Sequence, residues 1–412
     1  MYNHTQRILV NLFLAMTLLL TMAAPAWADQ DVPAGQILVK FRPGTPAQVV
    51  AETHRQNGGQ LAGVIAGIDV HVVKVPAGNE QAKVAAYLKN PNILYAEVDG
   101  VYSAVESFTP PPNDTYYSQQ WQYNNTGQAA GTPDADIDAP EAWAVTAGSS
   151  AVYIAILDTG VDQSHPDLMG KIAGNKNFSN SKTVDDKYGH GTHVAGSAAA
   201  ITNNAMGVAG TCPDCMLLNV KVLGDNGSGN WSWIANGITW ATDNNAKVIN
   251  MSLGGTSGSS ALRDAVDYAW GKGVVVVAAA GNSSTSQPFY PAAYPNAIAV
   301  AATDRNDAMA SFSNYGSAWV DVAAPGVDIL STAPDHRNRI WGRGTSYDTL
   351  SGTSMASPHV AGIAGLVWSQ GACSTATCVR TAIEHGSDPI LGTGTNWAWG
   401  RVNAYKAVTI TP

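Results

Sequence analysis

Apolar and polar positions in the first part of the chain follow strand-like and helix-like periods in turn. We predict strands at residues 36–41, 70–75 and 93–98, and helices at 46–56 and 80–88. In the first strand, the alternating apolar residues Ile37, Val39 and Phe41 share one face. Strands alternating with two helices predict a small ferredoxin-like α+β domain that could fold by itself.

The longer second part contains continuous apolar runs that end in polar or glycine-rich loops. These runs predict strands at residues 152–157, 217–222, 248–253, 274–280 and 298–302. Helical patterns at 231–244 and 260–272 lie between some of them. Apolar strands alternating with helices predict an α/β fold, in which a mostly parallel sheet is covered by helices on both faces.

A proline-rich stretch separates the two parts. Residues 108–113 read Phe-Thr-Pro-Pro-Pro-Asn, which favours an extended, exposed linker with no core of its own. We therefore place a domain boundary within residues 104–113.

The first residues have the pattern of a secretory signal peptide. Arg7 precedes an apolar run over residues 8–24, and Ala26-Trp27-Ala28 forms a cleavage-type sequence. A membrane anchor is the alternative, but three polar residues interrupt the run, and it is short for a membrane span. We expect residues 1–28 to be removed and the protein to be secreted. Since no later stretch is long and apolar enough to cross a bilayer, we expect no membrane association afterwards.

Charge and cysteine content narrow the range of partners. The net charge of -9 argues against nucleic acid or an anionic membrane surface. The four cysteines form two close pairs, Cys212 with Cys215 and Cys373 with Cys378. In an oxidising compartment, these spacings favour two small disulfide loops. A zinc site built from all four is the alternative, which would require two remote loops to meet.

Candidate chemistry centres on Ser354. This serine opens a segment of small and apolar residues that continues to Trp368, which predicts a buried helix starting near the serine. Pro358 is expected in the first helical turn, where a missing N–H costs little. Free backbone N–H groups and the positive end of the helix dipole would then favour an oxyanion beside the hydroxyl.

Three other polar residues stand at predicted strand ends or helix starts. Asp158 follows the strand at 152–157, Asn282 follows the strand at 274–280, and His190 opens a small-residue helix that runs through Ala200. Since functional groups of parallel sheets gather at the carboxyl ends of strands, these residues can meet Ser354. Together they supply a nucleophile, a base, an orienting carboxylate and an oxyanion donor.

Two alternatives concern single members of this set. Asp158-Thr159-Gly160 also resembles the catalytic sequence of an aspartic protease lobe, but that chemistry needs two carboxylates, and the chain has no second Asp-Thr-Gly or Asp-Ser-Gly. His193 competes with His190 for the role of base.

Three stretches together resemble the signature motifs of the subtilisin-like serine proteases, the subtilase family. They are residues 156–161 (Ile-Leu-Asp-Thr-Gly-Val), 190–196 (His-Gly-Thr-His-Val-Ala-Gly) and 352–359 (Gly-Thr-Ser-Met-Ala-Ser-Pro-His), in the order Asp, His, Ser. The resemblance extends over residues 113–410, and within the family it is to the thermitase-like enzymes. It implies a three-layer subtilisin-like fold over residues 107–412.

The same resemblance assigns roles to individual residues. It implies a catalytic triad of Asp158, His190 and Ser354, with Asn282 as the oxyanion donor and His193 as a structural neighbour. It further implies two edges that bind substrate backbone as an added strand, formed by Ser252, Leu253 and Gly254 and by Gly227, Ser228 and Gly229. The alternative for these glycines is ordinary loop punctuation.

The first domain, residues 29–106, resembles the propeptide of this family. The resemblance implies that it assists folding and inhibits the active site until it is cut away, so that the chain is a zymogen whose propeptide acts as an intramolecular inhibitor.

The resemblance also implies one calcium site. Its expected ligands are Asp114, Asp167, Ile201, Asn204, Met206 and Val208, the isoleucine, methionine and valine through main-chain oxygens. The alternative is that Asp167 caps a helix and that residues 203–204 form a turn. For a second, thermitase-like site, Asn177 and Ser181 stand where aspartates are expected, and only Asp185 and Asp186 could compensate. Val194 replaces a cysteine of thermitase-like enzymes.

We therefore expect a secreted, monomeric serine endopeptidase that hydrolyses proteins and peptides. Its pocket, lined by Gly254 and residues 278–281, has no acidic cluster, which predicts a broad preference for large apolar or aromatic residues before the scissile bond. A catalytically silent binding protein of the same fold is one alternative. An N-terminal unit that works separately as a protease inhibitor is another.

Overall fold

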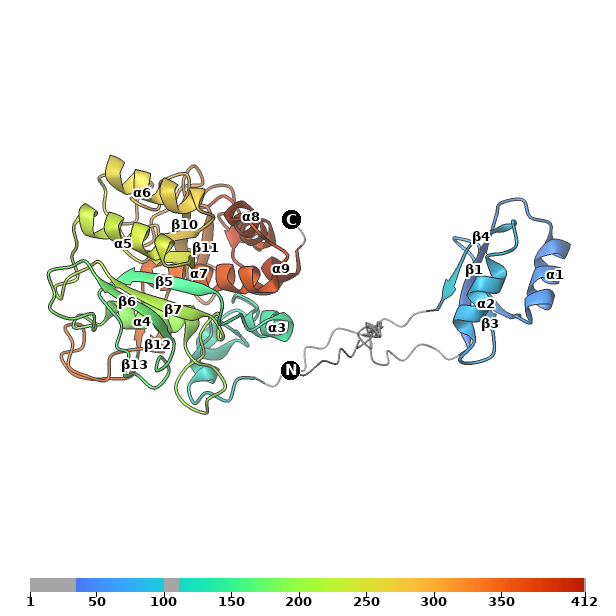
Figure 1. Cartoon of the computed structure of the whole chain (residues 1–412), viewed down its shortest axis with the longest axis horizontal. Coiled ribbons are helices and arrows are strands. Elements are labelled where there is room, and N and C mark those ends of the chain that lie inside the picture. The colour runs from blue at the N-terminus through green and yellow to red at the C-terminus, as the bar shows by residue number, and fades with distance from the viewer. Residues whose placement is uncertain (1–34, 100–110, 411–412) are drawn as a thin grey trace, which may run out of the picture. The chain divides into compact units, whose positions relative to one another are not determined.

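The chain divides into two units, Met1–Glu106 and Ser107–Pro412. The computed structural model describes residues 35–99 of the first unit and 111–410 of the second, and Figure 1 labels their elements. The expected signal peptide and most of the expected linker lie outside these residues.

The first unit contains an antiparallel sheet of four strands and two helices. Its elements are β1 (Gln36–Phe41), α1 (Ala47–Asn57), β2 (Gln60–Ile65), β3 (Val70–Lys74), α2 (Glu80–Tyr87) and β4 (Ile93–Val98). The strand order β2-β3-β1-β4 and the βαββαβ sequence of elements are those of a ferredoxin-like fold, as predicted. Ile37, Val39 and Phe41 of β1 are buried with Val84 and Tyr87 of α2 in the core of this unit.

The sequence analysis missed β2. This strand lies at the edge of the sheet, and its apolar residues Leu61, Val64 and Ile65 are 48%, 44% and 43% exposed. A register shift between Leu61 and Gly63 further breaks the alternation. Because neither face is regularly buried, the strand carries no period-two pattern.

The second unit is built on an eight-stranded sheet. Its β-strands are β5 (Tyr153–Asp158), β6 (Ile172–Asn177), β7 (Met216–Lys221), β8 (Ala246–Met251), β9 (Val275–Ala279), β10 (Ile298–Thr303), β11 (Val322–Pro325) and β14 (Gly400–Arg401). They stand in the order β14-β11-β10-β9-β8-β5-β7-β6, and all neighbouring pairs are parallel. A separate antiparallel ribbon pairs β12 (Ile329–Thr332) with β13 (Tyr347–Leu350).

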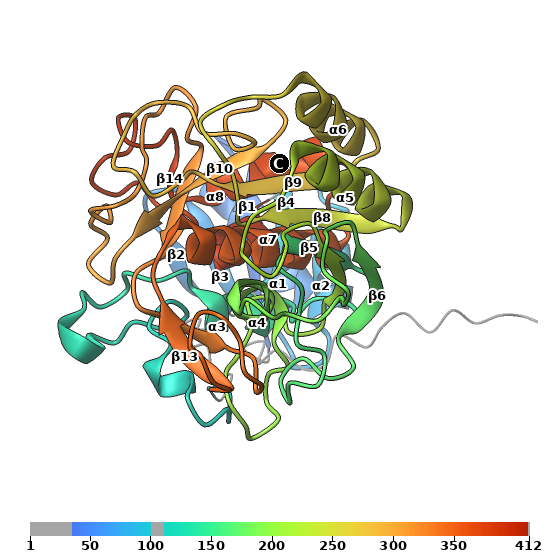
Figure 2. The same cartoon turned by 90° about the vertical axis from the view of Figure 1, so that its left-hand side faces the viewer.

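Helices cover both faces of the large sheet. They are α3 (Ala139–Val145), α4 (His190–Ala199), α5 (Trp231–Asp243), α6 (Ser260–Gly271), α7 (Thr353–Gln370), α8 (Ala376–Gly386) and α9 (Ala404–Thr409), with two 3₁₀ turns, η1 (Tyr117–Gln119) and η2 (Gln128–Ala130). Figure 2 shows α5 and α6 on one side of β8 and β9, and α4 and α7 on the other.

Side-chain alternation along β5 produces this three-layer arrangement. Ile154 and Ile156 pack with α4 and α7 in one core, whereas Ala155 and Leu157 pack with α5 and α6 in the other. A strand buried on both faces must be apolar at every position, which explains the continuous apolar runs in the sequence. The expected α/β architecture is confirmed.

Two further expectations can be compared with this unit. Cys212 is bonded to Cys215 and Cys373 to Cys378, so both disulfide predictions are confirmed and no thiol is left for zinc. Within residues 35–99 and 111–410, no helix combines the length and the apolar character that a membrane span requires.

Candidate active site

Asp158 and His190 meet at the carboxyl end of β5. Asp158 is the last residue of this strand, its side chain is only 1% exposed, and its Oδ1 and Oδ2 lie 2.8 and 3.0 Å from Nδ1 of His190. Gly191 permits this approach, because a β-carbon there would lie 2.2 Å from the carbonyl oxygen of Gly160. Burial lowers the pKa of His190, but the charge and hydrogen bond of Asp158 outweigh it, so the net pKa is raised.

A second buried carboxylate fixes the start of the helix that carries His190. Asp186 accepts hydrogen bonds from the backbone N–H groups of Gly189 and Thr192 and from the hydroxyls of Thr159 and Thr192. These bonds join the loop before α4 to the loop after β5. Asp186 therefore fixes the backbone that carries His190, while Asp158 binds the imidazole directly.

Ser354 is the second residue of α7, and its backbone is tied to Ser252. The Ser354 hydroxyl donates to the carbonyl oxygen of Ser252 at 3.3 Å, and the Ser252 hydroxyl donates to the carbonyl oxygen of Ser354 at 2.8 Å. The helix begins at Thr353, so Pro358 lies in its second turn. The expectation that Pro358 lies in the first turn was wrong. Since proline lacks an N–H, the Ser354 carbonyl has no partner within the helix, and Ser252 replaces it.

Asn282 lies beside the nucleophile with its amide oriented. Its Oδ1 accepts the backbone N–H and the hydroxyl of Thr353, both at 2.9 Å. The Thr353 hydroxyl also accepts the N–H of Gly281 at 3.0 Å. Because Oδ1 is occupied, Nδ2 is the end of the amide that can donate to a bound oxygen.

A cavity of about 430 Å³ adjoins these residues. It is bordered by His190, by both expected substrate edges and by the apolar side chains Leu223, Trp231, Ile234, Leu253 and Leu262. The structure thus brings all six expected substrate-binding residues to one cavity. The sequence analysis missed Trp231, Ile234 and Leu262, because their helical spacing in α5 and α6 is also that of ordinary core positions.

Comparisons with known proteins agree with this geometry. The sequence profile of the subtilase family matches residues 149–400, and that of the fervidolysin N-terminal prodomain matches residues 23–99. The chain belongs to the subtilase family. It is a serine protease of that family with an N-terminal prodomain, and so a zymogen.

Individual relatives extend over most of this subtilase. Thermitase of Thermoactinomyces vulgaris is 55% identical over 298 residues, which is 72% of this chain and 99% of thermitase. The thermophilic serine proteinase of Bacillus sp. strain AK1 is 46% identical over 91% of this chain and 87% of its own length. Among solved structures, a protease from Pseudoalteromonas arctica PAMC 21717 matches with a TM-score of 0.64 and 32% identity, covering 73% of this chain and all of that one.

His193 occupies a different place from His190. It is fully buried in α4, and its Nε2 lies 3.0 and 3.1 Å from the carbonyl oxygens of Ile329 and Asp348. Burial lowers its pKa to about 3. A neutral imidazole that donates to β12 and β13 positions these strands against the helix.

The six expected calcium ligands of the subtilase gather around the loop at residues 201–208. Asp167 accepts the side-chain amide of Asn204 at 2.8 Å and the N–H of Val208 at 2.9 Å, and its carbonyl oxygen accepts the N–H of Ile201. The Asn204 side chain in turn accepts the N–H of Met206 at 2.9 Å.

Asp114 supplies the observation that fits a cation. Its Oδ1 is buried without a hydrogen-bond partner, and burial together with the charge of Asp167 raises its pKa. Two close carboxylates without a counter-charge suit a hard cation held by oxygen ligands. A β-carbon at Gly207 would lie 2.0 Å from Oδ2 of Asp167, so the loop needs glycine to approach this closely.

The loop that was considered, but not predicted, as a second cation site makes other contacts. Asn177 donates to the carbonyl oxygen of Ser181 at 2.7 Å, and the Asp186 carboxylate is engaged at the start of α4. The fully buried ammonium of Lys221 contacts the carbonyl oxygens of Thr159 and Asp185. A lysine thus supplies positive charge within this loop.

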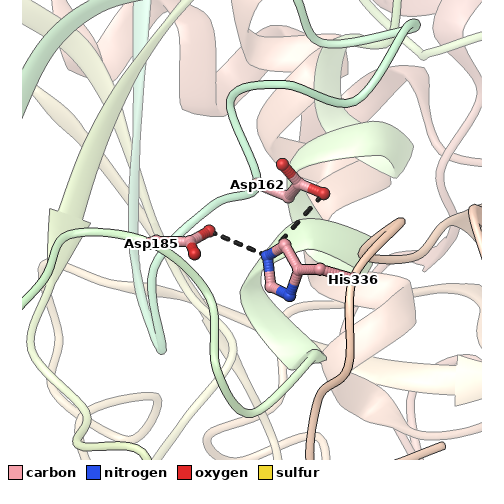
Figure 3. Close-up of side chains that lie close together, drawn as sticks. All are labelled: Asp162, Asp185 and His336. Atoms are coloured by element: carbon pink, nitrogen blue, oxygen red, sulfur yellow. Dashed lines mark hydrogen bonds and ion pairs between the residues drawn. The ribbon is translucent and has the colours of Figure 1, made fainter. Parts of the chain in front are cut away.

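One cluster of metal-type ligands lies near this loop (Figure 3). The ring nitrogen Nε2 of His336 is 3.0 Å from Oδ1 of Asp185 and 3.9 Å from Oδ2 of Asp162. Burial lowers the pKa of His336, but hydrogen bonding and attraction by the carboxylates outweigh it, so the net pKa is raised. When His336 is protonated, it forms an ion pair with these two carboxylates that joins the segment around residue 336 to the loop before α4.

Proposed function

We propose that this subtilase is a serine endopeptidase whose triad is Asp158, His190 and Ser354. The Nδ1–H group of His190 donates to Asp158, which leaves the lone pair of Nε2 free to accept the Ser354 proton. The Ser354 oxygen then attacks the peptide carbonyl carbon. In the protein without substrate this hydroxyl is bonded to Ser252, and a catalytic hydrogen bond to the base often forms only when substrate binds.

Asn282 is the oxyanion donor in this proposal. Nδ2 donates to the oxygen that becomes negative when the carbonyl carbon turns tetrahedral. The C–N bond then breaks as Nε2–H of His190 protonates the leaving amine, and a water molecule hydrolyses the acyl-enzyme with the same base. The Asp158 carboxylate stabilises the imidazolium that forms.

The single observation that carries the proposal is the hydrogen-bonded Asp158–His190 pair at the carboxyl end of β5. His190 borders the same cavity as Ser252, to which Ser354 is bonded. A binding protein of the same fold has no need of a carboxylate that raises the pKa of an imidazole next to a hydroxyl.

Substrate backbone is proposed to bind as an added strand between residues 227–229 and 252–254. Both edges border the 430 Å³ cavity, whose apolar lining suits an apolar side chain of the substrate. A broad preference for apolar residues follows. The position of Phe289 argues against the narrower expectation of a large residue directly before the scissile bond.

We further propose the processing scheme expected from the sequence. Residues 1–28 act as a signal peptide, residues 29–106 as an inhibitory propeptide, and residues 107–412 as a secreted, extracellular and monomeric peptidase.

Calcium is the proposed cation at Asp114, Asp167 and Asn204, with main-chain oxygens of residues 201, 206 and 208. A bound cation would hold the loop at residues 201–208 by linking it to the chain near Asp114.

Labelling with a fluorophosphonate tests the proposed nucleophile. We expect the mature protein to react at Ser354, and Ser354→Ala to lose both labelling and peptide cleavage. A folded mature protein that does not react would favour a binding protein instead. The separate-inhibitor alternative is tested by adding purified residues 29–106 to an unrelated subtilisin-type protease and to this enzyme: inhibition of the former alone would support it.

A further inference from the structure

One aromatic ring lies where the substrate residue before the scissile bond would place its side chain. The scissile carbonyl must lie between Ser354 and Asn282. Ser252, which accepts the Ser354 hydroxyl, leads directly to Gly254 on one side, and Gly281 precedes Asn282 on the other. The substrate residue that contributes the scissile carbonyl therefore places its side chain between Gly254 and Gly281. We call this space the scissile slot.

Phe289 contacts both walls of the scissile slot. A β-carbon on Gly254 would lie 2.4 Å from Cε1 of Phe289, and a β-carbon on Gly281 would lie 3.0 Å from its Cγ. Both glycines thus present bare backbone to the same ring. The space that their missing side chains leave open is taken up by Phe289 itself.

The loop that carries this ring is fixed to the substrate edge. The N–H of Tyr290 donates to the carbonyl oxygen of Gly255, and the N–H of Gly255 donates to that of Tyr290, both at 2.8 Å. The residue after Phe289 is therefore held by a two-bond bridge to Gly255, the residue next to Gly254. The ring can leave the slot only by rotating its own side chain or by breaking this bridge.

We propose that Phe289 closes the scissile slot, so that the enzyme cleaves after small residues, namely glycine, alanine and serine. This inference rests on the proposed endopeptidase function and sharpens its specificity. A large side chain would have to displace a ring packed against two backbone walls, and overfilling a packed site is unfavourable. The 430 Å³ cavity shares Gly254 with the slot, but neither Phe289 nor Gly281 lines it, so closing the slot leaves room there for a large apolar side chain.

Peptides that differ only in the residue before the scissile bond test this proposal. For the mature enzyme, we expect kcat/KM after alanine to exceed that after phenylalanine by about 10- to 100-fold, the range by which a pocket discriminates on side-chain size. Equal cleavage after alanine and phenylalanine, or faster cleavage after phenylalanine, would overturn the proposal.

Opening the slot should weaken the preference for alanine. We expect Phe289→Gly to raise kcat/KM after phenylalanine by at least about 10-fold, and Phe289→Ala to do so to a smaller extent. Gln287→Gly is the matched control, because Gln287 is exposed on the same loop and should leave the ratio of the two substrates as in the wild type. The proposal is also overturned if both Phe289 variants fold and keep the wild-type ratio of cleavage after alanine to cleavage after phenylalanine.

The same peptides separate this inference from the proposed function. If the folded, mature wild type cleaves none of them and Ser354 is not labelled, the endopeptidase function fails. If it cleaves them all and prefers phenylalanine, only the role of Phe289 fails. Should Phe289→Gly not fold, the wild-type ratio and Phe289→Ala still decide.

Discussion

A buried histidine pair in the prodomain predicts that acid destabilises this unit. His54 is 6% exposed, its Nδ1 lies 2.9 Å from the Tyr87 hydroxyl, and its Nε2 lies 2.9 Å from Nδ1 of His71. The ring of Phe41 packs edge-on against it. When at least one histidine is neutral, one ring can donate to the other, but when both are protonated the two facing nitrogens each carry a hydrogen and this hydrogen bond is lost.

The expected magnitude follows from the pKa of His54. Burial, and then the charge of His71, lower this pKa from 6.5 to about 4. The unfolded chain therefore binds more protons than the folded unit as the pH falls from 6.5 toward 4. The stabilisation is present above pH 6.5 and is lost below it, by about 2 kcal/mol between pH 7 and pH 5.

Other charges near the two histidines change the size of this loss of stability in acid but not its direction. Burial and the charge of Lys40 lower the pKa of His71, while Asp69, 4.0 Å from its Nε2, raises it, and the net shift is downward. Both histidines thus favour unfolding in acid.

Hydrogen exchange on full-length Ser354→Ala protein, in which cleavage is blocked, would measure the effect. After correction for the intrinsic pH dependence, we expect protection in residues 35–99 to fall about 30-fold from pH 7 to pH 5. A His54→Gln/His71→Gln variant should show a much flatter dependence, and β5 and α7 serve as internal controls. Unchanged protection at pH 5, or the same loss in the double variant, would refute this reasoning.

Three further predictions concern the peptidase unit. Asn282→Ala should lower kcat by about 10²- to 10³-fold with little change in KM, the size of effect measured for such a donor in a related protease, and a loss confined to KM would contradict the oxyanion role. Because Asp158 raises the pKa of His190, kcat/KM should increase with pH through a midpoint above 6.5, and steady-state kinetics on Asp158→Asn should show that midpoint abolished or shifted down. Removing calcium should lower the thermal midpoint of the mature protein by several degrees in calorimetry, and Asp114→Asn should weaken the response to calcium; an unchanged midpoint in verified metal-free protein would exclude the site.

Most elements of the fold could be predicted from the sequence because their signals are local. The five elements predicted in the first unit match the structure to within one residue at each end, since β1 alternates, β3 and β4 are short runs rich in apolar residues, and both helices have clear limits. In this unit only β2 was missed, because an exposed edge strand has no buried face to impose a pattern. In the second unit, the continuous apolar runs of the sequence likewise predicted a sheet covered by helices on both faces.

By itself the sequence determined which residue types could act together. Asp158, His190, Asn282 and Ser354 stand at strand ends and helix starts, so local patterns, together with the resemblance to a family, were enough to group them. Their order along the chain, which supported the resemblance, can be read without knowing any distance between the side chains. The two cysteine pairs were equally local, with separations of only 3 and 5 residues.

Only the tertiary structure decided what surrounds these residues. Pro358 was expected in the first turn of α7, but the helix starts earlier, and the carbonyl that the proline leaves free accepts the hydroxyl of Ser252, which follows β8. Phe289, in a polar loop with no periodic signal, fills the slot that Gly254 and Gly281 leave open. The physical reason is the same in both cases. Periodicity and motifs record how each residue fits its own element, whereas the contacts that tune reactivity and specificity join residues far apart in the chain, and packing alone determines them.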